Sequence, residues 1–84
     1  MSEQIIYSAD ITIEIIKGQQ YGDFASDHEM YAVLLEEVEE VWHEIKNNKA
    51  QGFKERLRKE LVQVAAVAIR AIQELDEATC QQSK

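Results

Sequence analysis

The chain has 84 residues, no Pro, only three Gly and a formal net charge of −7, which together favour a single small all-α domain (residues 1–84) with an acidic surface. Such a surface repels phosphate backbones, so nucleic-acid polymers are not expected as partners. The sequence also lacks a signal-peptide pattern and any apolar run near the roughly 20 residues of a membrane span, so we expect a cytoplasmic protein without a membrane partner.

The first predicted helix covers residues 3–20. Apolar residues recur in it at steps of three and four, as on one stripe of a helix: Ile6, Ala9, Ile13 and Ile16. Residues 11–15 (ITIEI) also alternate as a β-strand does and are rich in β-branched side chains. The length of the segment and the lack of partner strands favour the helix.

The second predicted helix, residues 27–46, begins at a capping box in which Ser26 caps the first amides and Glu29 answers in return. Its apolar residues alternate at steps of three and four, as in a helix packed nearly parallel or antiparallel to another: Tyr31, Leu34, Val38, Val41 and Ile45. The polar segment 47–52, which ends in Gly52, is the only good interior linker.

The third predicted helix spans residues 54–78 and is followed by a polar tail whose single Cys80 is expected to be inert. Between residues 61 and 69 only Gln63 interrupts an apolar stretch that covers every side of the helix, as in a helix buried all round. Two short helices can shield only part of it. We therefore expect the remaining side to pack against another subunit, in a homodimer or homotetramer, through its small residues Ala65, Ala66 and Ala68.

Carboxylates crowd the second predicted helix in the segment LLEEVEEVWHE, residues 34–44. At about 100° per residue, Glu37 and Glu40 lie on one face, and Glu37 borders the apolar seam. Pairs such as Glu36 and Glu40 place like charges four positions apart, which costs about 0.2–0.5 kcal/mol per pair unless a cation neutralises them. A positive charge is therefore expected nearby.

Two kinds of cation meet this expectation. The basic residues that open the third predicted helix can reach the carboxylates across an antiparallel helix pair: Lys54, Arg56, Arg58 and Lys59. Alternatively, Mg²⁺ seeks carboxylate oxygens, and Glu60-x-x-Gln63 on the third helix can face Glu37-x-x-Glu40 on the second. The residue types alone leave both interpretations open.

The segments LLEEVEEVW and KELVQVAAVAI, within residues 28–75, resemble the MazG-like all-α nucleoside triphosphate pyrophosphohydrolases. The chain looks similar to the short, single-domain members of that family that are common in phages and prophages. The family pattern is EExxE on one helix and ExxD on the next. Glu36, Glu37 and Glu40 match the first half and Glu60 matches the second, whereas Gln63 stands where the family has Asp.

The resemblance implies a site for Mg²⁺, or for Mn²⁺ in its place, with Glu37, Glu40, Glu60 and Gln63 as ligands and Glu36 adjacent in the motif. It implies cleavage of a nucleoside triphosphate between the α and β phosphates, with Glu36, Glu37, Glu40 and Glu60 as the catalytic residues. Members of the family work as dimers or dimers of dimers, with the metal site inside a four-helix arrangement.

A second hypothesis is a noncatalytic helical oligomer or protein-binding module, a relative that lost its metal chemistry together with the Asp. The neutral Gln63 favours this hypothesis, whereas the retained like charges on one helix face favour the enzyme. Trp42 can stack on a nucleobase or pack in a subunit contact. His28 and His43 are expected at the surface. P-loop, serine-hydrolase and zinc-enzyme motifs do not occur in the sequence.

Overall fold

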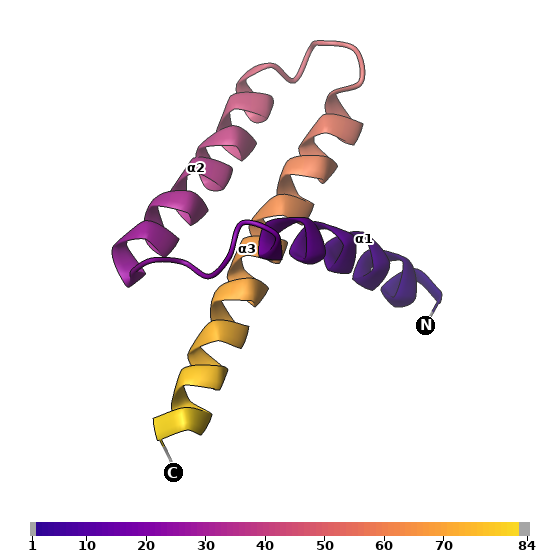
Figure 1. The fold of residues 1–84 in the computed structure, drawn as a ribbon. Coiled ribbons are helices and arrows are strands. Elements are labelled where there is room, and N and C mark those ends of the chain that lie inside the picture. The colour runs from indigo at the N-terminus through magenta and orange to yellow at the C-terminus, as the bar shows by residue number, and fades with distance from the viewer. Residues whose placement is uncertain (1, 83–84) are drawn as a thin grey trace.

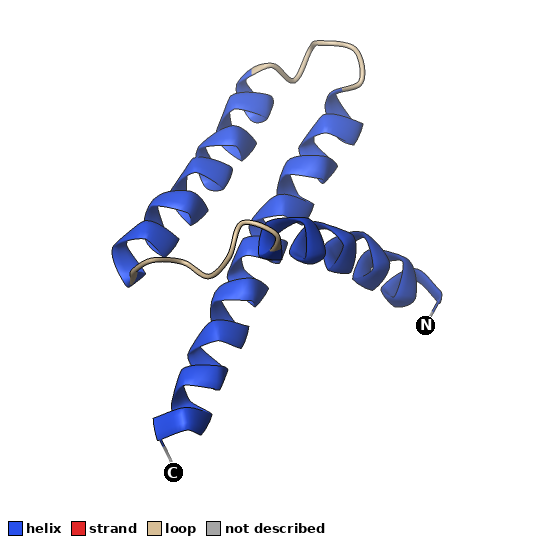
Figure 2. Ribbon diagram, in the orientation of Figure 1, coloured by secondary structure: helices blue, strands red, loops and turns tan. Residues whose placement is uncertain are grey.

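The computed structural model describes the backbone of residues 2–82 and the side chains of residues 9–78. Over that backbone it contains three helices and no strand: α1 (Ser2–Gln19), α2 (Asp27–Lys46) and α3 (Phe53–Gln82) (Figure 1; Figure 2). The all-α prediction is confirmed, including the choice of helix over strand for the first segment. The third helix is longer than expected, because it ends at Gln82 rather than at residue 78. The side chains of Ile6 and Cys80 lie outside the described residues.

α3 is the central element and packs against both other helices. α2 and α3 form an antiparallel hairpin, and α1 crosses α3 near its middle with its N-terminal end pointing away from the hairpin (Figure 1). The hairpin turn is residues 47–52, as predicted. Gly52 has a φ of 77°, in the left-handed region that favours glycine, and its carbonyl accepts from the Arg56 amide at 3.1 Å as α3 begins.

The start of α2 is held by a reciprocal cap. Ser26 is the N-cap, and its Oγ accepts from the Glu29 amide at 3.1 Å. Glu29 Oε1 accepts in return from the Ala25 amide at 2.9 Å. The predicted pairing of Ser26 with Glu29 at the start of the helix is confirmed. The Glu29 carboxylate, however, accepts from the backbone amide of Ala25 rather than from that of Ser26. Two backbone donors that the helix cannot pair are satisfied in this way.

Arg70 of α3 anchors the connection between α1 and α2. Its guanidinium lies 3.9 Å from the centre of the Phe24 ring, and Glu74, one turn on, accepts from the Phe24 amide at 3.0 Å. Gly18, near the end of α1, leaves room for this arrangement, because a Cβ there would overlap the guanidinium of Arg70. The end of α1 and the following loop are thereby held against α3.

The hydrophobic core of one chain is small. Among the described residues, its buried apolar side chains are Ile15 of α1 and three residues of α3: Ala66, Val67 and Ala71. Within one chain α3 is covered only in part, as expected from two short helices, because Leu61, Ile72 and Leu75 are exposed. None of the helices, over the described range, is long and apolar enough to cross a membrane.

Two packing predictions need correction. Ala66 was expected on the side of α3 that faces another subunit, but it is 4% exposed and borders a cavity with Gly18 of α1. It lies about 100° around the helix from Ala65, on the side where α1 packs. The predicted seam of α2 is likewise split. Leu34 and Val41 are half-buried, whereas Tyr31, Val38 and Ile45 are exposed, because residues at steps of three and four can belong to two neighbouring stripes.

Candidate functional site

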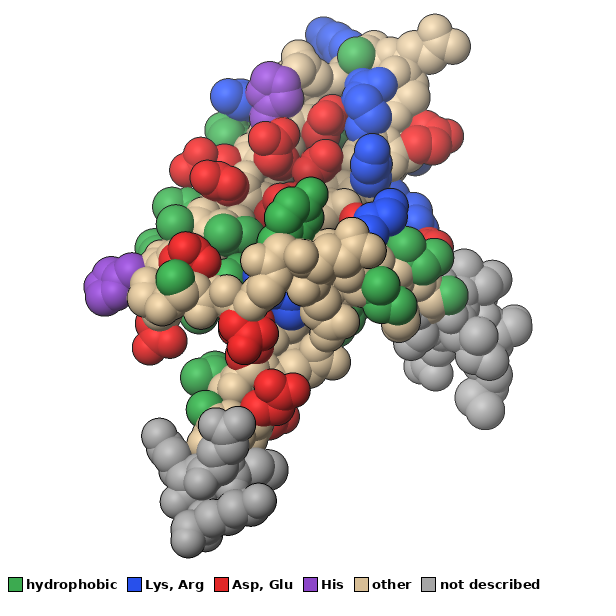
Figure 3. Space-filling view, in the orientation of Figure 1, with side chains coloured by type: hydrophobic (Ala, Val, Ile, Leu, Met, Phe, Trp, Pro, Cys, Tyr) green, Lys and Arg blue, Asp and Glu red, His purple; other side chains and the backbone are tan. Residues whose placement is uncertain are grey.

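Three of the predicted ligands lie near enough across the α2–α3 hairpin for their charges to act on one another. Burial raises the pKa of Glu37 above its ordinary value, and the charges of Glu60, Glu40, Glu36 and Glu14 raise it further, in that order. Glu37 is half-buried on the side of α2 that faces α3. Figure 3 shows acidic side chains gathered over α2 on the face of the molecule that carries α1, with Lys and Arg side chains over the start of α3.

Glu60 completes this group from α3. Burial raises its pKa, the charges of Glu40 and Glu44 raise it further, and Lys59 lowers it. The charges of Glu37, Glu40 and Glu60 thus act on one another across the hairpin, whereas their role as metal ligands stays a prediction. Glu36 is exposed and borders a hollow on the outer side of α2 with Glu39 and Glu40, so it stands at the edge of the group.

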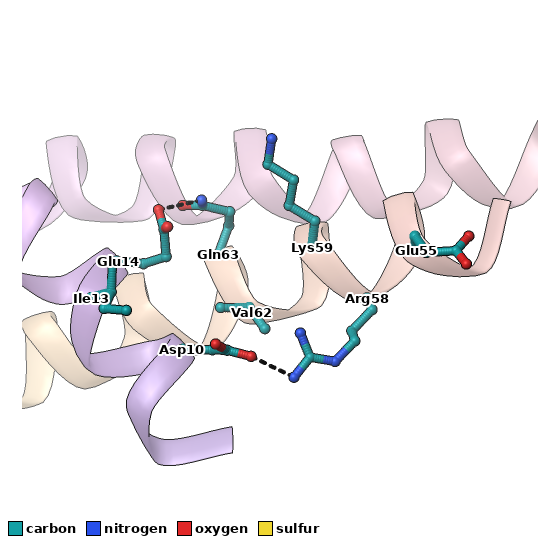
Figure 4. Close-up of a pocket in the computed structure, with 8 residues that line it drawn as sticks. All are labelled: Asp10, Ile13, Glu14, Glu55, Arg58, Lys59, Val62 and Gln63. Carbon is teal, nitrogen blue, oxygen red and sulfur yellow. Dashed lines mark hydrogen bonds and ion pairs between the residues drawn. The ribbon is translucent and has the colours of Figure 1, made fainter. Parts of the chain in front are cut away.

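Gln63 is engaged by a residue that the sequence analysis missed. Its Nε2 donates to Glu14 Oε1 of α1 at 2.6 Å (Figure 4). The one available signal was that Glu14 is the only charged residue among the isoleucines of residues 11–16. That pattern does not reveal a partner, because the position of α1 on α3 depends on tertiary packing. The amide nitrogen of Gln63 is thus committed to α1, and its carbonyl oxygen is the atom with which it can ligate a cation.

The basic residues of α3 neutralise other carboxylates. Arg56 Nε pairs with Glu44 Oε1 at 3.0 Å, and Arg58 Nη2 pairs with Asp10 Oδ2 of α1 at 2.6 Å. Within the described side chains, no Lys or Arg forms an ion pair with Glu37, Glu40 or Glu60. The salt-bridge interpretation therefore holds for Glu44 at the end of α2, whereas the central carboxylates form no ion pair with a described side chain and only the more distant charge of Lys59 opposes that of Glu60.

Two hollows meet at the bond between Glu14 and Gln63. One, of about 330 Å³, lies among the three helices and is bordered by Glu37 and Arg70. The other, of about 230 Å³, lies between α1 and α3 and is bordered by Arg58 and Lys59 (Figure 4). Glu14 and Gln63 line both. Carboxylates and cationic side chains thus stand on either side of one polar contact.

The donor chemistry of this site suits a hard divalent cation, since its side chains offer carboxylate and amide oxygens. As the side chains stand, no three His, Cys, Asp or Glu residues among those described are grouped closely enough to hold one ion. Binding would therefore require the carboxylates of Glu37, Glu40 and Glu60 to rotate toward a common point.

The raised pKa values predict an unusual pH dependence of stability. Because the folded chain binds protons at Glu37 and Glu60 more tightly than the unfolded chain does, these two groups stabilise the fold fully below the ordinary pKa of 4.5. That contribution is lost as the pH rises through their folded pKa values. When the pH falls from 7 to about 5, the free energy of unfolding should rise more for the wild type than for the double variant Glu37→Gln, Glu60→Gln. Urea unfolding at fixed protein concentration measures this difference. Equal pH dependence of the two proteins would contradict the prediction.

Trp42 and both histidines are exposed, which confirms the surface placement expected for His28 and His43. His43 Nε2 lies 3.5 Å from Asn47 Nδ2, and the Lys46 ammonium lies 5.8 Å from the Trp42 ring. Comparison of the chain with protein-family models, with curated proteins and with solved structures found no match. Any function assigned to the site therefore depends on the chain's own residues.

Proposed function

We propose that this chain is a Mg²⁺-dependent nucleoside triphosphate pyrophosphohydrolase, able to use Mn²⁺, that acts in the cytoplasm as a homodimer or homotetramer. The observation that supports the proposal is the set of like charges at Glu37, Glu40 and Glu60, contributed by two adjacent helices and joined by no ion pair among the described side chains. Like charges held together without a partner destabilise a fold, and a divalent cation bound among them would remove that cost. The resemblance to MazG-like enzymes points to the same three residues.

In the proposed reaction, water attacks the α phosphorus of the nucleotide. The bond from that phosphorus to the oxygen bridging to the β phosphorus breaks, and pyrophosphate leaves with the bonding electron pair. Mg²⁺ held by Glu37, Glu40, Glu60 and the carbonyl oxygen of Gln63 would neutralise phosphate charge. A carboxylate of the group that the ion leaves free would accept the proton of the attacking water.

The hollow between α1 and α3 has two cationic side chains, Arg58 and Lys59, that support a phosphorylated substrate, although the carboxylates of Asp10 and Glu55 border it as well. Glu14 and Gln63 connect it to the hollow that Glu37 borders. A triphosphate carries more negative charge than one divalent ion neutralises, so cationic side chains beside the ion would bind the remaining phosphate oxygens. Lys59, whose charge already acts on Glu60, is the residue best placed to contact both groups.

The alternative is a noncatalytic helical oligomer or protein-binding module. The observation that favours it is the bond from Gln63 to Glu14, which uses the residue at the family's Asp position as a link between two helices. In that case the protein would bind divalent ions no better than other acidic surfaces do. Pyrophosphate release, measured over ribo- and deoxynucleoside triphosphates with Mg²⁺ and with Mn²⁺, distinguishes the two functions directly.

A metal-binding test needs no substrate. We expect Mg²⁺ to raise the melting temperature of the wild type, with about 2.7 kcal/mol of stabilisation when its concentration is about 100 times its Kd. Glu37→Gln should abolish this shift. Without metal, the same substitution should raise stability by about 0.5 kcal/mol, because it removes repulsion from Glu60 and Glu40.

Glu39→Gln is the matched control, because Glu39 is exposed on the same helix and is not among the charges that act on Glu37. That variant should keep the full Mg²⁺ shift. If Glu37→Gln and Glu39→Gln respond to Mg²⁺ equally, the ion acts through general ionic strength and the metal site is wrong. If Glu37→Gln lowers stability in the absence of metal, the carboxylate has a stabilising partner and the supporting observation fails.

A further inference from the structure

The side of the α2–α3 hairpin opposite α1 carries two apolar strips. The strip on α2 follows steps of four and three: Tyr31, Leu35, Val38, Trp42 and Ile45. These side chains are 39–62% exposed, and the two largest, Tyr31 and Trp42, are exposed by 62% and 58%. Five such residues in one line are the pattern of a helix that packs along another helix.

The strip on α3 has the same spacing and a different size profile: Leu61, Ala65, Ala68, Ile72 and Leu75. Leu61, Ile72 and Leu75 are half-exposed or more, and the two alanines between them are half-buried. Small residues therefore occupy the middle of the α3 strip, whereas the α2 strip is bulky throughout.

Helix geometry places both strips on one face. The α2 strip lies about 110° around its helix from the residues that face α3, and the α3 strip lies about 120° around from those that face α2. Because the helices are antiparallel, these rotations bring the strips to the same side of the hairpin. α1 crosses α3 on the other side, where the acidic residues of α2 also gather (Figure 3). We call the surface formed by the two strips the bare face.

The chain exposes more surface than a compact monomer of its mass would, which leaves area available for a partner. The accessible surface is 6677 Å², whereas a folded monomer of 9.7 kDa is expected to have about 5,100 Å². The radius of gyration is 14.8 Å, against about 12 Å for a compact chain of this length. The excess of about 1,500 Å² is within the range that one subunit contributes to an obligate homodimer, about 1,000–2,500 Å².

We propose that the bare face binds the same face of a second copy of this chain, so that two hairpins form a four-helix core with α1 of each copy on the outside. A copy supplies what the face lacks, because bulky side chains of one α2 strip can fill the space above Ala65 and Ala68 of the other chain. Both strips are uncharged, and the central carboxylates point away from the contact. Two chains of net charge −7 can therefore meet without desolvating Glu37, Glu40 or Glu60.

Sedimentation equilibrium at micromolar concentration tests the pairing. The wild type should have the mass of two 9.7 kDa chains or a multiple of two, and Val38→Lys should have the mass of one while keeping its helical circular dichroism. Tyr21→Lys is the matched control, because Tyr21 is 89% exposed in the α1–α2 loop, away from the bare face, and it should leave the mass unchanged. A monomeric wild type would overturn the proposal and would assign the bare face to a different partner. A Val38→Lys variant that still forms dimers would also overturn it.

Trp42 gives a second readout that does not depend on any variant folding. It is the only Trp of the chain, so its emission should shift to the blue as wild-type concentration rises and to the red on dilution. Association without this shift would show that the copies meet elsewhere. The inference rests on the assembly clause of the proposed function and not on its chemistry. A dimer through this face that releases no pyrophosphate would refute only the chemistry, and an active monomer would refute only the pairing.

Discussion

Replacing Ala66 with Asp should unfold the chain, whereas replacing Ala68 with Asp should leave it folded and separate the two copies. Ala66 is 4% exposed and lies where α1 packs on α3. A carboxylate at that position would enter the packing between α1 and α3, and a buried charge without an ion-pair partner costs about 3–5 kcal/mol. That is a large part of the roughly 5–15 kcal/mol that stabilises a whole domain.

Ala68 differs only in its direction on the same helix. It belongs to the α3 strip of the bare face, so an Asp there stays hydrated in the single chain and becomes buried only when a second copy binds. Urea unfolding followed by circular dichroism measures the first effect, and sedimentation equilibrium measures the second. Loss of helical structure in Ala68→Asp to the same extent as in Ala66→Asp would mean that the two alanines share one core, as the sequence had predicted.

The second large effect is expected at position 63, where the sign depends on Mg²⁺. In Gln63→Asp the hydrogen bond from Nε2 to Glu14 Oε1 is replaced by two facing carboxylates, next to the hollow that Glu37 also borders. Without metal, this change should destabilise the fold by about 1–3 kcal/mol. With Mg²⁺, the added carboxylate should tighten binding, and each tenfold gain corresponds to about 1.4 kcal/mol.

Thermal melts of wild type, Gln63→Asp and Gln63→Asn, each with and without Mg²⁺, separate the contributions. Gln63→Asn shortens the side chain and weakens the bond to Glu14 without adding charge, so it should lose stability in both conditions. Only Gln63→Asp should regain stability with Mg²⁺, and its pyrophosphate release should rise in parallel. A loss of stability in Gln63→Asp that Mg²⁺ does not reverse would exclude an ion site at this position, while leaving the link between α1 and α3 intact.

The helices and half of the candidate site followed from local patterns. Ser26 and Glu29 mark the start of α2, and Gly52 marks the turn into α3, because backbone amides at helix ends and a positive φ need particular side chains. The spacing of Glu37 and Glu40 on one helix, with Glu60 at the head of the next, was enough to bring three charges within electrostatic reach of one another once the helices were antiparallel. Such features depend on neighbours within a few residues or across one short turn.

Tertiary structure decided which neighbour covers each helix face. The sequence alone determined that α3 is apolar on nearly every side between residues 61 and 69, but only the packing of α1 assigned Ala66 to the chain's own core and left Ala65 and Ala68 on the bare face. The same packing brought Glu14 to Gln63, across 49 residues of chain. Periodicity fixes which side chains share a face of a helix, whereas the partner of that face is set by packing between segments distant in sequence, which a repeat of three and four residues does not encode.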